Sequence, residues 1–308
     1  MSSIITITFS PCIDKSTSIE ALIPNNKLQC ASPKLEPGGG GINVARAIKK
    51  LGGEALAIYP SGGYTGKHFN HLLSKENIPV MIIETLNESR ENIIVLDKSA
   101  NKQYRFGMPG TALQEEEWKQ CLQAIEKTTK VEFIVASGSL PPGVPNDIYG
   151  RIALIAKKKN AKLIVDTSGE ALKHAVNEGV FLVKPNIAEL GYLAGKEINT
   201  DEAVNISQSL ISKGQCEIVV VSMGADGAML VSANKVYTVK PPPVVQKSTV
   251  GAGDSLVAGI VYSLSNKMNL KEALMYGIAC GTSATMNPGT ELCNKKDADD
   301  LFNLMNQG

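Results

Sequence analysis

One acidic residue follows a run of very small residues near the C-terminal end of the chain. Asp254 comes directly after Gly251, Ala252 and Gly253, and apolar residues recur at helical spacing over 256–264. Small residues let a ligand approach the backbone, and free N–H groups at a helix start attract anions. Asp254 could therefore take a proton while these N–H groups hold a phosphoryl group. Spacing alone equally allows Asp254 to serve only as a helix cap.

Glycine is the enriched residue of this chain, with 28 copies in 308 residues, and several copies precede predicted helices. This placement favours phosphate chemistry. Two common phosphate motifs nevertheless fail. Residues 62–68 resemble a P-loop, but Ser61 replaces its first glycine and His68 its hydroxyl residue. Residues 38–43 lack dinucleotide spacing, because Asn43 stands where the third glycine is required.

The charges of the chain nearly cancel, with 31 Lys plus Arg against 30 Asp plus Glu and a net charge of +1. We therefore expect neither a nucleic-acid nor a membrane partner. The longest aliphatic run, 218–221, is far too short to span a membrane. The first residues lack the pattern of a signal peptide, so a cytoplasmic location is expected.

Metal-binding patterns of cysteine and histidine are missing from the sequence. The six cysteines lie at least a dozen residues apart, which predicts reduced thiols rather than a zinc cluster. His68 and His71 are three residues apart, and chance neighbours on one helix explain them better than a metal site does.

These residues need a scaffold, and the apolar pattern predicts one in which strands alternate with helices. Such alternation is typical of a mostly parallel sheet covered by helices on both faces. Strands are predicted at 4–9, 56–59, 80–83, 132–136, 162–166, 181–184 and 217–222. Helices are predicted at 42–51, 66–76, 114–127, 146–159, 169–177, near 187 and 202, and at 252–265, 270–286 and 296–306.

Two polar, alternating hairpins interrupt this pattern, one with strands at 16–20 and 27–34 and one at 92–96 and 103–106. We expect them to form a discontinuous β-lid over 13–34 and 89–108. The large α/β domain then comprises 1–12, 35–88 and 109–308. The lid strands have unpaired edges, so pairing with the lid of a second subunit predicts a homodimer.

The motifs taken together resemble the ribokinase-like sugar kinases over essentially the whole chain. They lie at 38–45, 137–143, 184–189, 222–227, 249–254 and 287–290. Segments 11–14, 27–30 and 103–110 are similar to the phosphosugar branch of that family. The resemblance implies a three-layer αβα sandwich with a small β-sheet lid.

The same resemblance implies ATP-dependent phosphorylation of a phosphohexose, with fructose 6-phosphate and its C1 hydroxyl favoured. Fructose 1-phosphate and tagatose 6-phosphate are alternative substrates within the family. A sugar-phosphate or nucleotide sensor without catalysis is the alternative from another class. Asp254 is the implied general base, and Gly251, Ala252 and Gly253 form the implied anion hole.

Binding roles are carried over from the family position by position. The implied sugar-phosphate residues are Asp14, Lys27, Gly39, Gly40, Gly41, Asn43, Arg90 and Ser139. The implied nucleotide residues are Lys184, Asn186, Ser222, Gly224, Gly227, Ile278 and Thr282. Glu189 would orient Mg²⁺ through water; the spacing of Asn186 and Glu189 also fits a capping box, and the two roles are compatible.

A monovalent-cation site is implied beside the anion hole, with K⁺ as the candidate ion. Its residues are Ser248, Val250, Ala284, Asn287 and Gly289, with backbone carbonyls as the main ligands. Two residues depart from the family pattern. Glu291 stands where a close relative has arginine, which changes the charge beside the cation site by two units and makes dependence on K⁺ a hypothesis. Gln29 also stands where that relative has arginine, so sugar-phosphate binding would depend more on Lys27 and Arg90.

Overall fold

A nine-stranded sheet forms the centre of the computed structural model, which describes residues 3–307. Its order is β13-β12-β11-β10-β9-β8-β1-β4-β5, and all neighbours are parallel except the two last pairs at the β13 edge. The strands are β1 (Ile4–Ile7), β4 (Leu56–Gly62), β5 (Val80–Thr85), β8 (Phe133–Ser137), β9 (Lys162–Asp166), β10 (Val180–Val183), β11 (Cys216–Ser222), β12 (Ala228–Ser232) and β13 (Val236–Val239).

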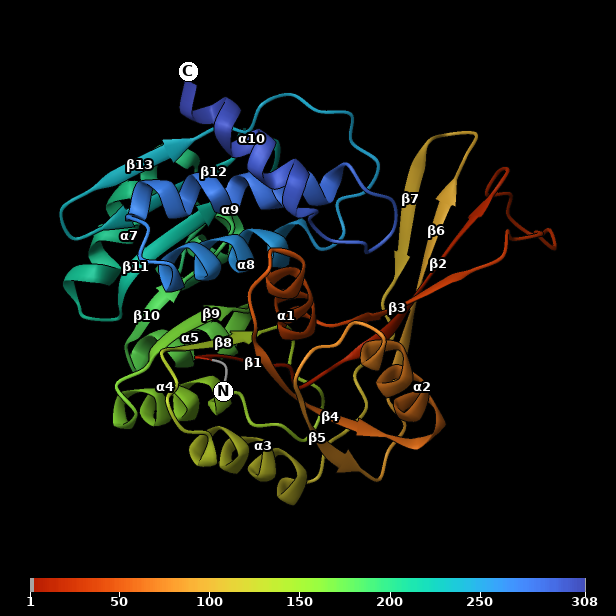
Figure 1. Cartoon of the computed structure of the whole chain (residues 1–308), viewed down its shortest axis with the longest axis horizontal. Helices are drawn as coiled ribbons and strands as arrows, with labels where there is room; N and C mark the ends of the chain where they lie inside the picture. The colour runs from red at the N-terminus through yellow and green to blue at the C-terminus, as the bar shows by residue number, and fades with distance from the viewer. Residues whose placement is uncertain (1–2, 308) are drawn as a thin grey trace.

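Helices cover both faces of this sheet (Figure 1), and each face has its own apolar core. One core includes residues of α3 (Glu115–Lys127), α4 (Ile148–Lys158), α5 (Gly169–Asn177), α6 (Ile187–Ala194) and α7 (Ala203–Ser212). The other includes residues of α1 (Gly40–Lys50), α2 (Gly63–Ser74), α8 (Ala252–Ser265), α9 (Leu270–Thr285) and α10 (Lys295–Gln307). Short 3₁₀ turns lie at η1 (Thr200–Glu202) and η2 (Gly224–Asp226). The predicted three-layer αβα sandwich is confirmed.

A second, four-stranded sheet projects from one side of the large body (Figure 1). Its order is β3-β2-β6-β7, with β2 and β6 parallel and the outer pairs antiparallel. The strands are β2 (Cys12–Ile19), β3 (Lys34–Gly38), β6 (Arg90–Asp97) and β7 (Lys102–Phe106). The predicted small β-sheet is therefore present, built from two segments far apart in the sequence.

The strand predicted at 27–34 is wrong. Residues 21–33 contain no strand, and β3 begins only at Lys34 and continues to Gly38, so the small sheet includes residues expected in the large domain. Pro33 has no N–H to donate to a sheet ladder, which explains why regular pairing starts after it. The segment is bonded to β2 through Ala31, whose N–H donates to the backbone oxygen of Ser18 at 2.9 Å and whose backbone oxygen accepts from Oγ1 of Thr17 at 2.7 Å.

Strand β2 also differs from its prediction, because it starts at Cys12 rather than at residue 16. Its whole length pairs with β6, from Cys12 opposite Arg90 to Ile19 opposite Asp97. The sequence prediction missed β12 and β13, which extend the large sheet. Among the residues that the structure describes, no helix is long and apolar enough to cross a membrane.

The strand order of the large sheet changes direction at β1. From β1 the chain leads to β4 and β5 on one side, and later to β8 and β9 on the other. In open α/β sheets, ligands bind at such a switch point, outside the carboxyl ends of the strands. The loops after β1 and β8 are therefore where the topology places a functional site.

Candidate active site

A pocket of about 320 Å³ opens at the carboxyl ends of β8 and β9. It is lined by Gly40, Ser137, Gly138, Ser139, Asp166, Thr167, Ser168, Glu189 and Asp254. Four of these residues, Gly40, Ser139, Glu189 and Asp254, were predicted from widely separated motifs. The fold brings them together at the switch point of the sheet.

The N-terminus of α8 carries Asp254 in its first turn. Helices α3, α6 and α9 begin with capping boxes, but no side chain among the described residues caps α8. Gly251 precedes α8 at φ 74°, and a Cβ there would lie 2.5 Å from Cδ2 of Leu292. Glycine is therefore required at this position, and the first N–H groups of α8 remain available for an anion.

The carboxyl group of Asp254 is held in place by an amide from another helix. Nδ2 of Asn43, in α1, donates a hydrogen bond of 2.9 Å to Oδ2 of Asp254. Burial, together with the negative charges of Asp166 and Asp14, raises the pKa of Asp254 to about 7, against the opposing effects of Asn43 and Lys184. A group with this pKa can exchange a proton near neutral pH, as a general base must.

Lys184 follows β10 and supplies positive charge to this end of the pocket. Its Nζ lies 3.0 Å from Oδ1 of Asp166, and a Cβ at Gly253 would lie 3.9 Å from the same Nζ. Burial disfavours the ammonium ion, but the carboxylates of Asp166, Glu189 and Asp254 outweigh burial and raise the pKa of Lys184. The lysine therefore stays charged beside the uncapped start of α8.

The glycines at the start of α1 pack against the ends of β1 and β8. A Cβ at Gly40 would lie 2.3 Å from Oγ of Ser137, and one at Gly41 2.6 Å from the backbone oxygen of Ile7. Gly39 has φ 112°, a conformation that L side chains rarely adopt. This close approach places Asn43 within reach of α8.

Asp14 is buried in β2, beside the large domain. Its Oδ1 accepts hydrogen bonds from Nδ2 of Asn92 at 3.0 Å and from Sγ of Cys12 at 3.3 Å. A Cβ at Gly38 would lie 2.3 Å from Oδ2 of Asp14, so glycine is needed beside this carboxylate. Burial raises the pKa of Asp14.

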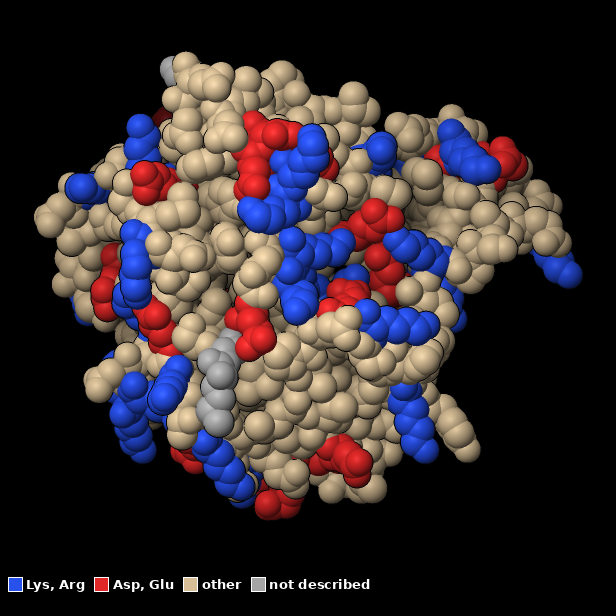
Figure 2. Space-filling view, viewed as in Figure 1, with Lys and Arg blue, Asp and Glu red and all other residues tan. Residues whose placement is uncertain are grey.

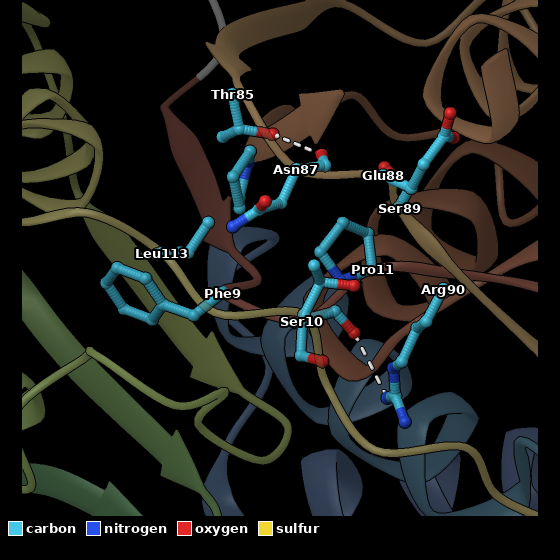
Figure 3. A pocket seen from close by; sticks show the side chains of 11 residues that line it. Phe9, Ser10, Pro11, Thr85, Asn87, Glu88, Ser89, Arg90 and Leu113 are labelled. Carbon is cyan, nitrogen blue, oxygen red and sulfur yellow. Dashed lines mark hydrogen bonds between the residues drawn. The ribbon is translucent and has the colours of Figure 1, made fainter. Parts of the chain in front are cut away.

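Arg90 begins β6 at the junction of the two sheets. Its guanidinium donates to the backbone oxygens of Met108 at 2.9 Å and Ser10 at 3.1 Å. Figure 3 shows its side chain next to Ser10 and Pro11, at the edge of a cavity of about 20 Å³. That cavity has room for roughly one water molecule, so a sugar phosphate near Arg90 must bind outside it.

Lys27 is not brought to this site. It lies in the exposed segment between β2 and β3, and no bond to another described residue is found for its ammonium group. Its predicted phosphate-binding role stays a prediction.

The predicted nucleotide residues lie along the neighbouring strand ends and on α9. Asn186 and Glu189 form the predicted capping box, with both hydrogen bonds at 2.9 Å. Asn186 also forms an isolated bridge with Ser222 at the end of β11. Gly224 begins the short turn η2 and Gly227 follows it, both at positive φ, of 60° and 88°. Ile278 and Thr282 are buried one helical turn apart in α9.

The predicted cation-site residues lie in the loop before α8, in the last turn of α9, which contains Ala284, and in the loop after α9. Oγ of Ser248 donates to the backbone oxygen of Gly289 at 2.9 Å and accepts from the N–H of Val250 at 3.2 Å. The N–H of Asn287 donates to the backbone oxygen of Ala284 at 3.2 Å.

Glu291, which stands where a close relative has arginine, is paired with a lysine of the small sheet. Its Oε1 accepts a hydrogen bond from Nζ of Lys34. Lys50 of α1 donates to the backbone oxygen of Glu291. The negative charge of Glu291 is therefore balanced locally.

The P-loop-like segment has its own helix start occupied by a carboxylate. Glu88 accepts hydrogen bonds from the N–H groups of Tyr64 at 3.0 Å and Thr65 at 2.9 Å, at the beginning of α2. These bonds lower the pKa of Glu88. An ionised side chain holds the amides that a phosphate would need, which is a structural reason to reject a Walker-type site there.

Two charged residues of the site were missed by the sequence prediction. Asp166 ends β9, and its position at the carboxyl end of a predicted parallel strand was an available signal. Arg46 lies on the predicted helix after the glycines. It is 3% exposed, and its Nη1 lies 3.4 Å from Oδ1 of Asn43.

The charges outside the pocket form no extended region of one sign on the face that Figure 2 shows, where basic and acidic side chains alternate. Within the described part of the chain, no three or more His, Cys, Asp or Glu side chains are grouped so that they could hold a metal ion. All six cysteines are unpaired.

Comparison with known proteins identifies similar proteins along the whole length. Residues 4–297 match the model of the pfkB family carbohydrate kinases. The chain is 42% identical over 304 residues to the ATP-dependent 6-phosphofructokinase isozyme 2 of Escherichia coli, covering 98% of each chain. It is similar to the crystal structure of phosphofructokinase-2 from E. coli in complex with potassium, with a TM-score of 0.95, 42% identity and 99% and 100% of the two chains covered. The corresponding complex with fructose-6-phosphate gives a TM-score of 0.94, 40% identity and the same coverage.

Replacing the Asp254 carboxylate by an amide, in Asp254→Asn, is expected to stabilise the fold at alkaline pH. The pKa of about 7 lies above the ordinary value of 3.8, so the folded state binds more protons than the unfolded state between these values. Stability is therefore lost as pH rises through this window, and the amide removes that loss. Thermal unfolding should show Tm raised by about 3 °C at pH 8 and nearly unchanged at pH 4.

The exposed Asp201 offers a matched control for that experiment. Asp201→Asn should change Tm equally at both pH values. A Tm for Asp254→Asn that falls at pH 8, or that changes equally at pH 4 and pH 8, would contradict a raised pKa at Asp254.

Proposed function

The chain belongs to the pfkB family of carbohydrate kinases, and we propose that it transfers the γ-phosphoryl group of ATP to the C1 hydroxyl of fructose 6-phosphate. The observation that carries this proposal is the carboxyl group of Asp254 at the uncapped start of α8, with a pKa of about 7. The choice of fructose 6-phosphate is supported by the E. coli relative, which is named a 6-phosphofructokinase and whose crystal structure is known in complex with fructose-6-phosphate.

In this proposal Asp254 accepts the proton of the attacking hydroxyl. Its ionised form is the active one, so the rate rises with pH through about 7 and then levels off. Asn43 fixes one carboxylate oxygen, Oδ2, through its hydrogen bond of 2.9 Å. The other oxygen, Oδ1, then faces the sugar hydroxyl.

The transferring phosphoryl group binds the N–H groups at the start of α8. Gly251, Ala252 and Gly253 carry no side chain that would block it, and Lys184 lies beside Gly253. Phosphoryl transfer needs little covalent work from the protein, so positioning and charge stabilisation supply most of the catalysis.

Magnesium fits the donors that this pocket offers. Oε2 of Glu189 is used in the capping box, and Oε1 has no hydrogen bond to another described residue. Mg²⁺ usually keeps several waters and binds substrate phosphates beside one or two carboxylates. Glu189 would therefore hold the ion through its water shell, and Mg²⁺ would neutralise charge on the nucleotide phosphates.

The sugar phosphate would lie between the pocket and the small sheet. Asp14, Asn43 and the glycines of α1 would face its hydroxyls, and Ser139 lines the same pocket. Arg90 and the exposed Lys27 would contact its phosphate as the small sheet closes. Closure would exclude water and limit ATP hydrolysis.

The nucleotide would occupy the side formed by Lys184, Asn186, Ser222, Gly224, Gly227, Ile278 and Thr282. A cytoplasmic location is part of the same proposal.

A monovalent cation, K⁺, would bind between the loop before α8 and the last turn of α9 with the loop that follows it. Hydroxyl and carbonyl oxygens of Ser248, Val250, Ala284, Asn287 and Gly289 are donors suited to such an ion, and a potassium complex is known for the E. coli relative. We expect faster turnover in K⁺ than in Na⁺ buffer at equal ionic strength, measured as kcat. Equal rates in the two buffers would argue against the site.

A homodimer through the small sheet is supported by apolar side chains exposed on this sheet and on the segments next to its strands. Ile93 of β6 lies opposite Phe106 of β7, and both are exposed. Leu22 and Ile23, just after β2, and Met108, just after β7, are exposed as well, and few charges cover the projecting part in Figure 2. Such exposed apolar groups are typical of an interaction surface. Light scattering should give about twice the chain mass of 32.8 kDa, and a mass of one chain alone would contradict the dimer.

The proposed activity is tested by comparing kcat/KM on fructose 6-phosphate, fructose 1-phosphate and tagatose 6-phosphate with ATP. Fructose 6-phosphate should give the highest value. Asp254→Asn should lower kcat by about 10³-fold, because a general base is lost, while KM for both substrates stays close to that of the parent enzyme.

Asp201→Asn is the control for that variant and should keep full activity. A higher kcat/KM on another hexose phosphate would replace the proposed substrate. Near-normal turnover by Asp254→Asn would contradict the general-base role. Absence of ATP consumption with all three sugars would favour a non-catalytic sensor.

A further inference from the structure

Arg46 is a buried cation in α1 that neither substrate is proposed to touch. It is 3% exposed, and its guanidinium contacts two segments besides its own helix, β3 and the residues just after α2. Nη1 donates to the backbone oxygen of Pro37 at 2.6 Å, and Nε donates to Oε1 of Glu76 at 2.8 Å. Nη2 lies 3.8 Å from Oε1 of Glu36. These contacts fix the plane of the guanidinium.

The same guanidinium faces the amide that holds Asp254. Nη1 of Arg46 lies 3.4 Å from Oδ1 of Asn43, as a weak hydrogen bond. An amide has one acceptor end and one donor end. With Oδ1 directed to a cation, Nδ2 must point away from Arg46, and it donates to Oδ2 of Asp254 at 2.9 Å.

Glu36 extends these contacts to the loop after α9. Its Oε2 accepts from the N–H of Thr290 at 3.2 Å and from Oγ1 of Thr290 at 2.9 Å. The preceding residue, Gly289, accepts from Ser248, which lies in the loop that leads into α8. Arg46 and Glu36 therefore connect two parts of the structure that adjoin the N-terminus of α8. One is Asn43 of α1, and the other is the loop that leads into α8.

We propose that Arg46 is a positioning residue: it sets the orientation of the Asn43 amide, and through that amide it holds the Asp254 carboxylate in place for proton transfer. The proposal rests on the general-base role of Asp254 given above. Without the planar guanidinium of Arg46, the amide group of Asn43 can rotate. The hydrogen bond from Nδ2 of Asn43, which stabilises the ionised carboxylate of Asp254, is then lost.

The other charged groups near these residues act independently of that orientation. Asp254 faces Asp166 of β9, Asp14 of β2 and Lys184 after β10, with Glu189 of α6 lining the same pocket. Arg46 faces Glu36 of β3, Glu76 after α2, and Lys50 and Asp14 at longer range. A substitution that keeps the positive charge at position 46 leaves all these charges in place. It changes only the planar donor geometry of the guanidinium.

Arg46→Lys is that substitution, since lysine keeps the charge but has no planar fork. We expect the acidic limb of the pH profile of kcat/KM to move up by about one pH unit, because a hydrogen bond to the carboxylate is lost. At pH 9 kcat should recover towards that of the parent enzyme, with KM for ATP unchanged. A merely structural defect would lower the rate equally at all pH values, and that result would overturn the proposal.

Glu76→Gln is the matched control, because it alters the far side of the same guanidinium and leaves the contact with Asn43. The acidic limb of the pH profile of kcat/KM should lie at the same pH in Glu76→Gln as in the parent enzyme. A shift of that limb equal to the shift in Arg46→Lys would overturn the proposal. In an Asn43→Ala background, Arg46→Lys should cause no further shift, and an additive shift would show that Arg46 acts by another route.

A readout without turnover separates this proposal from the substrate assignment. NMR titration of ¹³C-labelled aspartate, with Asp254 assigned through Asp254→Asn, should show a midpoint about one unit higher in Arg46→Lys. An unchanged midpoint overturns the proposal even if fructose 6-phosphate is not the substrate. If Arg46→Lys does not fold, Arg46→Gln combined with Glu76→Gln removes both charges and carries the same expectation.

Discussion

The start of α8 combines free N–H groups with the carboxylate of Asp254, two groups that ordinarily bind each other at a helix N-terminus. A helix N-terminus presents free N–H groups, and an acidic side chain in the first turn ordinarily serves them. Asp254 lies in that turn, but its Oδ2 accepts from Asn43 of another helix, so the first amides of α8 stay free of a cap. In the proposed reaction, the carboxylate and the helix amides can thus act on two different parts, the hydroxyl proton and the phosphoryl group.

The rest of the fold maintains this separation. Glycines at 39–41 let α1 approach β1 and β8 closely enough for Asn43 to reach Asp254. Asp166 and Lys184 come from the ends of adjacent strands, where one raises and the other lowers the pKa of Asp254. Glu88 shows the ordinary alternative at α2, where a carboxylate takes the helix amides for itself and no anion site remains.

Much of this site could be predicted from the sequence because its chemistry is local. Asp254 and its three small neighbours form one continuous motif, and Asn186 with Glu189 shows the spacing of a capping box. The alternation of apolar strand and helix patterns along the sequence likewise predicted the three layers of the αβα sandwich. Asp166 and Arg46 were missed because their roles depend on tertiary neighbours, Lys184 for one and Asn43 for the other. The start of β3 was misplaced because alternation continues through residues 27–33, whereas pairing begins only after Pro33.

In the proposed mechanism, the transferring phosphoryl group is held at the start of α8 while Asp254 takes the proton. A crystal structure of the enzyme with ADP, Mg²⁺, aluminium fluoride and fructose 6-phosphate would test it most directly, because the fluoride complex occupies the position of that group. We predict fluoride atoms within hydrogen-bond distance, about 3 Å, of the N–H groups at 252–254, and the C1 hydroxyl at a similar distance from Asp254. A fluoride complex bound away from α8, or a C1 hydroxyl out of reach of Asp254, would contradict the claim.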